Sequence, residues 1–198
     1  MFYIFFFAQS KEWITQKSED GSVTVKSCIS EYKNKKGDIL PLIEYTATAI
    51  LSVDMENCVS VLKDISKHKA FLRDAKESRL IKFLSEHQSV VYYSFNVPWP
   101  FSDYDCVTKM SFVEVNGTGI FTLTSAPMLY KSTNDDRLIE YEMNYRFRDL
   151  KDGTVEITII GKMSPLIKIP LWMLRNTMPD HPAETLHKIV TLAKEIQQ

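Results

Sequence analysis

Residues that could carry acid–base, nucleophilic or metal chemistry are scattered along this chain. Its four histidines, His68, His87, His181 and His187, have no partner at the spacing of metal ligands. The chain contains no glycine-rich phosphate loop, no GxSxG nucleophile motif and no HExxH zinc motif. Asp105, His187 and several tyrosines are the nearest approach to a set of catalytic groups. We therefore expect a protein that catalyses no reaction and needs no cofactor or metal.

The three cysteines and the overall charge argue against further classes of protein. Cys28, Cys58 and Cys106 lie far apart without a CxxC spacing, which speaks against a disulfide framework or a zinc site. We expect each of them to be a small buried apolar residue. The formal net charge is -1, so the chain has no basic field that would attract nucleic acid. With 198 residues, 44% of them hydrophobic, the sequence fits one globular domain.

Turn signals separate runs of alternating apolar and polar residues. Asn116-Gly117 and Asp152-Gly153 each join two such runs, and Asp20-Gly21 and Lys36-Gly37 precede two more. Asn-Gly and Asp-Gly pairs adopt the positive φ angles that tight hairpins need. A parallel sheet would require longer helical crossovers than these intervals allow. The pattern therefore predicts an antiparallel sheet.

The alternating runs predict a sheet with one buried and one solvated face. The clearest run places on a single face Ile139, Tyr141, Met143, Tyr145 and Phe147. The run after the Asp152-Gly153 turn does the same with Val155, Ile157, Ile159, Gly161 and Met163. A third run, nearer the N-terminus, aligns Ile43, Tyr45, Ala47, Ala49 and Leu51.

Helical patterns occur in three places. A short segment begins at Trp13, and Asp54 caps a segment over Met55–Asp64 that continues in helical style over Lys67–Arg73. The longest pattern runs from Pro179 to Gln198, and its apolar stripe consists of Leu186, Ile189, Val190, Ala193 and Ile196. A long antiparallel sheet curved around this terminal helix buries the apolar face of both. We therefore predict an α+β fold.

Two stretches of the chain resemble the START-domain family. One strand ends at Pro98-Trp99-Pro100 and the next begins near Asp105, and Ile169-Pro170-Leu171-Trp172 precedes the terminal helix. The prolines around the tryptophan cannot continue a central ladder, so they mark a strand end independently of any family. In the family an arginine usually precedes the aspartate, where this chain has Tyr104. The structural role of that arginine is therefore lost or supplied by another residue.

The resemblance implies a helix-grip fold, in which a curved antiparallel sheet wraps around a long C-terminal helix. It also implies a tunnel for a sterol, phospholipid or sphingolipid, no cofactor and no catalysis. The function we expect is binding, with transfer as an extension, of a lipid or other hydrophobic ligand. Two alternatives stay open: a helix-grip enzyme of cyclase or hydrolase type acting on a hydrophobic small molecule, and an interaction domain with a filled core.

The predicted tunnel lies between the sheet and the terminal helix. Its lining consists of Tyr92, Tyr141, Met143, Tyr145, Ile157, Ile159, Leu186, Ile189, Val190 and Ala193, each of which could equally be ordinary core. The tyrosine hydroxyls would orient one polar group of the ligand. Met128, Leu129 and Trp172 form the predicted gate, which would touch a membrane during exchange; packing beneath the helix is the alternative.

The N-terminus differs in composition from the rest of the chain. Residues 1–9 form an apolar segment ahead of a single START-like domain over residues 10–198. The run MFYIFFFA is too short to cross a bilayer as a helix. It resembles the end of a signal-peptide core with a small residue near a cleavage point, although the basic start is missing. We interpret it as a truncated signal peptide of an exported protein, with an apolar arm packed on the domain as the alternative.

Overall fold

The computed structural model describes residues 11–34, 36–96, 102–131, 136–166, 169 and 171–196. Within them, nine strands form one antiparallel sheet in the order β1-β2-β3-β9-β8-β7-β6-β5-β4. The strands are β1 (Ile14–Lys17), β2 (Thr24–Lys33), β3 (Ile39–Leu51), β4 (Ala75–Ser85), β5 (Gln88–Phe95), β6 (Tyr104–Val115), β7 (Thr118–Ser125), β8 (Tyr141–Asp149) and β9 (Val155–Met163). The helices and short turns of helix are α1 (Met55–Lys63), η1 (Ile65–Lys67), α2 (His68–Phe71), η2 (Pro127–Leu129), α3 (Leu171–Thr177) and α4 (Asp180–Glu195).

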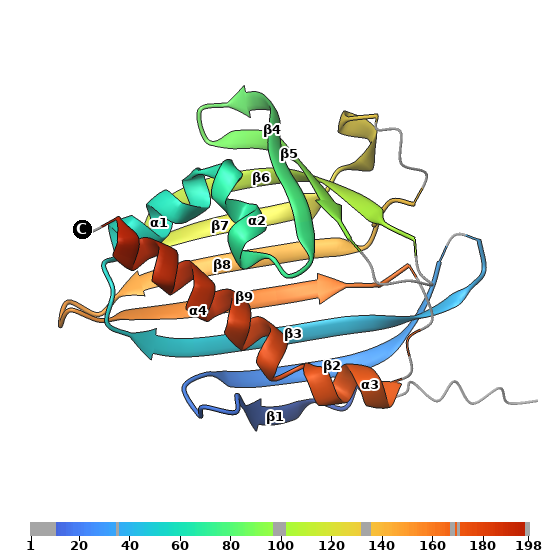
Figure 1. Ribbon diagram of the computed structural model, residues 1–198, viewed down its shortest axis with the longest axis horizontal. Helices are drawn as coiled ribbons and strands as arrows, with labels where there is room; N and C mark the ends of the chain where they lie inside the picture. The colour runs from blue at the N-terminus through green and yellow to red at the C-terminus, as the bar shows by residue number, and fades with distance from the viewer. Residues whose placement is uncertain are drawn as a thin grey trace, which may run out of the picture.

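The helices α1, α2 and α4 lie over one face of the sheet, which we call the inner face (Figure 1). Helix α4 crosses this face over β3 and β9, and it also contacts α1 and α2. The opposite face, which we call the outer face, carries the polar side of each alternating strand. This arrangement of a curved antiparallel sheet and a long C-terminal helix confirms the predicted α+β helix-grip fold.

Two hairpin turns explain why neighbouring strands pair in register. Asn116 and Gly117 have φ angles of 52° and 69°, the left-handed conformation required at both central residues of a type I′ turn. They join β6 to β7. Gly153 has a φ of 83° between β8 and β9, where a side chain would be strained. Both turns were expected from the sequence.

The alternation of β8 and β9 produces the predicted two-faced sheet. In β8 the side chains of Tyr141, Met143, Tyr145 and Phe147 are buried, whereas the residues between them are partly or fully exposed. Strand β9 shows the same pattern, with Val155, Ile157 and Ile159 buried. Ile139 departs from the prediction: it precedes β8 and is 50% exposed, because the pleat that would turn it inward begins at Tyr141.

The two long helices begin and bury their apolar faces largely as expected. The Asp54 carboxylate accepts a 2.7 Å hydrogen bond from the Glu56 backbone N–H and caps α1. In α4 the buried residues include the predicted Leu186, Ile189, Val190 and Ala193. Ile196, which the stripe was predicted to include, lies after the end of α4 and is 41% exposed. Within the described residues, no helix combines the length and apolar character needed to cross a membrane.

The N-terminal segment does not form the predicted helix. Trp13 is exposed, and Ile14–Lys17 form the short edge strand β1 on β2. Two β-branched residues, Ile14 and Thr15, lie beside the edge of β2, whose backbone groups would otherwise be unpaired on that side. Pairing with β2 is therefore favoured over local helix formation. The predicted apolar segment over residues 1–9 lies outside the described residues.

Candidate ligand-binding site

Four tyrosines converge on the inner face of the sheet. Tyr45 comes from β3, Tyr93 from β5, and Tyr141 and Tyr145 from β8, and all four belong to one buried apolar cluster. Their side chains are at least nine-tenths buried. Strand alternation explains the placement, because the inward residues of neighbouring strands share one face. The interior therefore combines an apolar body with several hydroxyl groups.

One of these hydroxyls is held by a buried histidine. His68 Nε2 lies 2.7 Å from the Leu62 carbonyl oxygen, which can only accept, so Nε2 carries the proton. Nδ1 consequently accepts from the Tyr93 hydroxyl at 2.8 Å. Burial lowers the pKa of His68 to about 4, so the ring is neutral near pH 7. His68 thus fixes Tyr93 and keeps neither nitrogen free for proton transfer.

Tyr141 and Tyr145 differ from Tyr93 because their hydroxyls have no hydrogen-bond partner among the described residues. Burial raises the pKa of both phenols, so they are neutral donors and acceptors. A buried polar group without a partner is unfavourable unless water or a ligand bonds it. These two hydroxyls are therefore available to a polar atom of a bound molecule.

A glycine makes room for the fourth tyrosine. The ring of Tyr45 lies directly over Gly161 of β9, and a Cβ at that position would overlap the ring. The Tyr45 hydroxyl reaches Met143 Sδ at 3.8 Å, a weak contact. The small residue in β9 thus allows an aromatic side chain from β3 to extend across the neighbouring strand.

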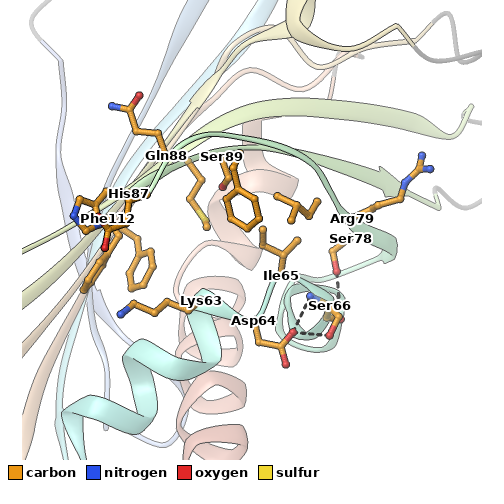
Figure 2. A pocket seen from close by; sticks show the side chains of 15 residues that line it. Lys63, Asp64, Ile65, Ser66, Ser78, Arg79, His87, Gln88, Ser89 and Phe112 are labelled. Carbon is orange, nitrogen blue, oxygen red and sulfur yellow. Dashed lines mark hydrogen bonds between the residues drawn. The ribbon is translucent and has the colours of Figure 1, made fainter.

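The inner face opens to solvent in a groove of about 800 Å³ between α1–η1 on one side and strands β4, β5, β6 and β7 on the other (Figure 2). We call it the α1–β5 groove. Its apolar wall consists of Ile65, Leu80, Phe83, Met110, Phe112 and Phe121. Pockets that hold small ligands usually measure roughly 300–1,000 Å³ and are mostly apolar. The groove has the size and the lining of such a pocket.

Most of the predicted lining residues lie together between the sheet and α4. They form one cluster that contains Tyr141, Met143, Tyr145, Ile157, Ile159, Leu186, Ile189, Val190 and Ala193. None of them lines the α1–β5 groove. Whether they contact a ligand stays a prediction.

The predicted position of Tyr92 requires a correction. Tyr92 packs with Val90 and Val107 in a separate cluster on the outer face, where its ring meets that of Tyr130 at 5.4 Å. Its neighbour Tyr93 points to the interior instead. Both faces of β5 are apolar, so the local pattern could not decide which tyrosine faces inward.

Sequence reasoning missed the groove because its residues come from five separate segments. Met110 and Phe112 alternate with Lys109 and Ser111 in β6, and that pattern could have placed them on the inner face. No local signal indicates that η1 and Leu80 of β4 line the same groove.

The residues of the predicted gate are exposed. Met128 is 93% exposed in η2, Leu129 beside it is partly exposed, and Trp172 is exposed on α3. Their contact with a membrane stays a prediction. Pro98, Trp99 and Pro100 lie outside the described residues.

Asp105 obtains its arginine partner from a distant segment. The Arg137 guanidinium donates to both carboxylate oxygens, from Nε at 2.7 Å and from Nη2 at 2.8 Å, and Asp105 has no exposed surface. Arg137 Nη1 also donates to the carbonyl oxygens of Pro127 and Tyr130. Tyr104 stacks on Phe95 with ring centroids 4.9 Å apart, and burial raises its pKa to about 12.

The remaining candidate groups lie away from the interior. His187 Nε2 lies 2.9 Å from the Ser22 hydroxyl and 3.6 Å from an Asp20 carboxylate oxygen, on the surface beside the β1–β2 turn. Among the described residues, no cluster of three His, Cys, Asp or Glu side chains could hold a metal ion. The three cysteines are free and buried, as expected.

We compared the chain with protein-family models and with known proteins. No protein-family model matches the chain. An uncharacterized protein from Pseudomonas aeruginosa is 20% identical over 190 residues, which cover 95% of this chain and 90% of that protein.

Several solved structures share the architecture. Human STARD10 has a TM-score of 0.75 and 20% identity, over 93% of this chain and 74% of that one. A STAR-related lipid transfer protein from Xanthomonas axonopodis has a TM-score of 0.72 and 19% identity, over 92% and 98% of the two chains. The Zhui aromatase/cyclase from Streptomyces sp. R1128 is more distant, with a TM-score of 0.58 and 9% identity over 79% and 96%. The chain therefore has the helix-grip fold of START domains.

Proposed function

We propose that this protein binds a lipid or another hydrophobic ligand on the inner face of its sheet. The observation that carries the proposal is the α1–β5 groove, about 800 Å³ of space beside apolar side chains of the inner face. Burial of apolar surface contributes roughly 25 cal/mol per Å², so a molecule of lipid size gains enough from that wall to bind without special chemistry. The fold shared with a STAR-related lipid transfer protein supports the same class of ligand.

A ligand that extends from the groove into the interior would find further polar groups there. The side chains of Tyr141 and Tyr145 are buried, and their hydroxyls have no hydrogen-bond partner among the described residues. A ligand oxygen that reached them would replace the hydrogen bonds they lack. Exchange of the ligand with a membrane extends the proposal, and the exposed side chains of Met128 and Trp172 are candidates for that contact.

The proposed role is binding without catalysis. The interior groups that could transfer protons are poorly suited to it, because the pKa of His68 is lowered to about 4 and both ring nitrogens are engaged. Burial raises the pKa of the phenols of Tyr141 and Tyr145, which makes them weak acids near pH 7. The fold itself does not decide the question, since a cyclase shares it.

Native mass spectrometry of protein purified without detergent tests the proposal, followed by organic extraction of any bound molecule. We expect one hydrophobic molecule per chain, or an increase in melting temperature with at least one member of a lipid and sterol panel. A bare protein that no member of the panel stabilises would contradict the proposal. Chemical conversion of a bound compound during incubation would instead favour the cyclase-type enzyme.

Two tryptophan variants locate the site. Leu80→Trp enlarges a partly buried side chain in the groove, whereas Val113→Trp enlarges an exposed side chain outside it. We expect Leu80→Trp to weaken ligand binding about tenfold, which corresponds to roughly 1.4 kcal/mol, and Val113→Trp to leave it unchanged. Equal affinities in both variants would place the ligand elsewhere on the inner face.

A further inference from the structure

The floor of the α1–β5 groove carries a hydroxyl that no described residue satisfies. Ser89 is only 4% exposed, lines the groove and forms no hydrogen bond through its side chain to any described residue. It stands opposite Phe83 of β4 and Met110 of β6 in the two ladders, so its neighbours on the floor are apolar. A ligand that covered this hydroxyl without bonding it would lose about 1–3 kcal/mol.

A lysine ammonium lies at the rim of the same groove. Lys63 is the last residue of α1, and its Nζ lies 4.4 Å from the centroid of the Phe112 ring, folded over the aromatic wall. Within the described part of the chain, no carboxylate lies within 4 Å of this ammonium. Figure 2 shows Lys63 and Ser89 on opposite sides of one opening. The Lys63 ammonium thus lies over the aromatic wall of the groove and has no acidic partner among the described residues.

The other charged groups of the groove are engaged or stand on its outer turn. The Asp64 carboxylate accepts from the Ser66 N–H and hydroxyl, and Arg79 lies 3.1 Å from Glu77. Glu86 belongs to the exposed turn between β4 and β5. Lys63 is therefore the charged side chain that lies directly over the apolar wall.

Ser89 and Lys63 stand over neighbouring positions of the groove floor. Ser89 pairs with Met110, and the Lys63 ammonium covers Phe112, two residues further along the same face of β6. Two residues of a strand span roughly 7 Å. With the flexible Lys63 side chain turned toward Ser89, a carboxylate or phosphate group between them would face the ammonium on one side and the hydroxyl on the other.

We propose that the α1–β5 groove binds a single-chain amphiphile whose anionic head group, a carboxylate or a phosphate, lies between Lys63 and Ser89. Its hydrocarbon chain then extends along Ile65, Leu80 and Phe121. This inference rests on the proposed function and adds the charge and place of the head group. In this arrangement the Lys63 ammonium pairs with the negative charge of the head group, and the Ser89 hydroxyl hydrogen-bonds one of its oxygens.

Four amphiphiles with the same twelve-carbon chain test the head group: dodecanoate, dodecyl phosphate, dodecanol and dodecyltrimethylammonium, titrated by calorimetry below their micelle concentrations. We expect the two anions to bind about fivefold more tightly than dodecanol, the scale of one partly exposed ion pair. Lys63→Gln should remove this preference and leave dodecanol unchanged. Ser89→Ala should weaken all three oxygen-bearing ligands and leave the ammonium compound unchanged.

Lys67→Gln is the matched control, because Lys67 lies on η1 outside the groove and 3.9 Å from Asp64. It should keep the preference for anions. A wild-type protein that binds all four compounds equally, or a preference that survives in Lys63→Gln, overturns the inference while leaving the proposed function intact. If none of the four binds and no lipid is extracted, the proposed function itself fails.

The methyl resonances of methionine locate the bound chain. With dodecanoate, we expect the Met110 signal on the groove floor to shift and that of Met128 on the exposed η2 to stay in place. A shift at Met143, in the core beneath α4, without one at Met110 would place the ligand in the deeper interior and contradict the groove. Carboxylate and phosphate as sources of the head group are distinguished by comparing dodecanoate with dodecyl phosphate.

Discussion

The Tyr93 hydroxyl donates to His68 Nδ1 at 2.8 Å, and the two rings lie almost parallel with centroids 5.9 Å apart. One residue comes from the central part of β5 and the other from α2, so this contact ties the helical layer to the sheet in an otherwise apolar core. The histidine is held on its other side by the Leu62 carbonyl. The pair therefore fixes the position of α2 over the inner face of the sheet.

Removal of the Tyr93 hydroxyl should destabilise the protein. Tyr93→Phe leaves His68 Nδ1 buried without a donor, which costs about 1–3 kcal/mol. Urea unfolding followed by circular dichroism measures the change. Tyr92→Phe is the control, because that ring packs on the outer face and its hydroxyl makes no hydrogen bond within the described residues. An equal loss in the two variants would show that His68 does not depend on Tyr93.

The stability of the fold should decrease as the pH falls from about 6.5 to about 4. The pKa of His68 is lowered to about 4 in the folded protein, so the unfolded chain binds more protons in this window and unfolding is favoured there. The full difference corresponds to about 3 kcal/mol. Burial lowers the pKa of His181 as well, and it acts in the same direction.

The contribution of His68 can be separated by substitution. His68→Leu should flatten the dependence of the unfolding free energy on pH between 6.5 and 4, and His181→Leu should retain most of it. A pH dependence that is identical in the wild type and in His68→Leu would exclude His68 as its source.

Loss of Arg137 should be among the most damaging single changes on the outer side of the sheet. Arg137→Ala removes the guanidinium from the fully buried Asp105 carboxylate, and breaking such a pair costs about 3–5 kcal/mol. Arg148→Ala, which breaks an exposed pair with Glu156, should cost about 1 kcal/mol or less. Thermal unfolding of the two variants makes the comparison. A loss in Arg137→Ala no greater than in Arg148→Ala would mean that Asp105 is neutralised by other means.

Gly161→Ala should destabilise the core through the ring of Tyr45. The new methyl group would overlap that ring, and overpacking of this kind costs about 1–3 kcal/mol. The double variant Gly161→Ala/Tyr45→Val provides space and should be more stable than the sum of the two single changes predicts. Simple additivity of the two losses in urea unfolding would contradict the proposed overlap.

The sequence predicts those parts of the fold that local physics decides. The Asn116-Gly117 turn and the alternation from Tyr141 to Phe147 each specify their own conformation, and the structure agrees with both. The local sequence predicts a helix at Trp13, because the pairing of Ile14–Lys17 with the edge of β2 depends on residues outside that stretch. Tyr92 and Tyr93 could not be separated, since both faces of β5 are buried. The α1–β5 groove depends on the distance between η1 and β4, which only tertiary packing sets.

Strand β4 forms one wall of that groove, and it is also an edge of the sheet. Its pairing with β5 shifts register between Leu80 and Lys82 and again between Phe83 and Ser85, beside two of the groove residues. An interior strand could move only by breaking ladders on both sides, whereas β4 has to adjust one ladder that is already irregular. The α1–β5 groove thus has one wall that can shift. We expect it to accept ligands of different width while the strands beneath α4 keep their positions.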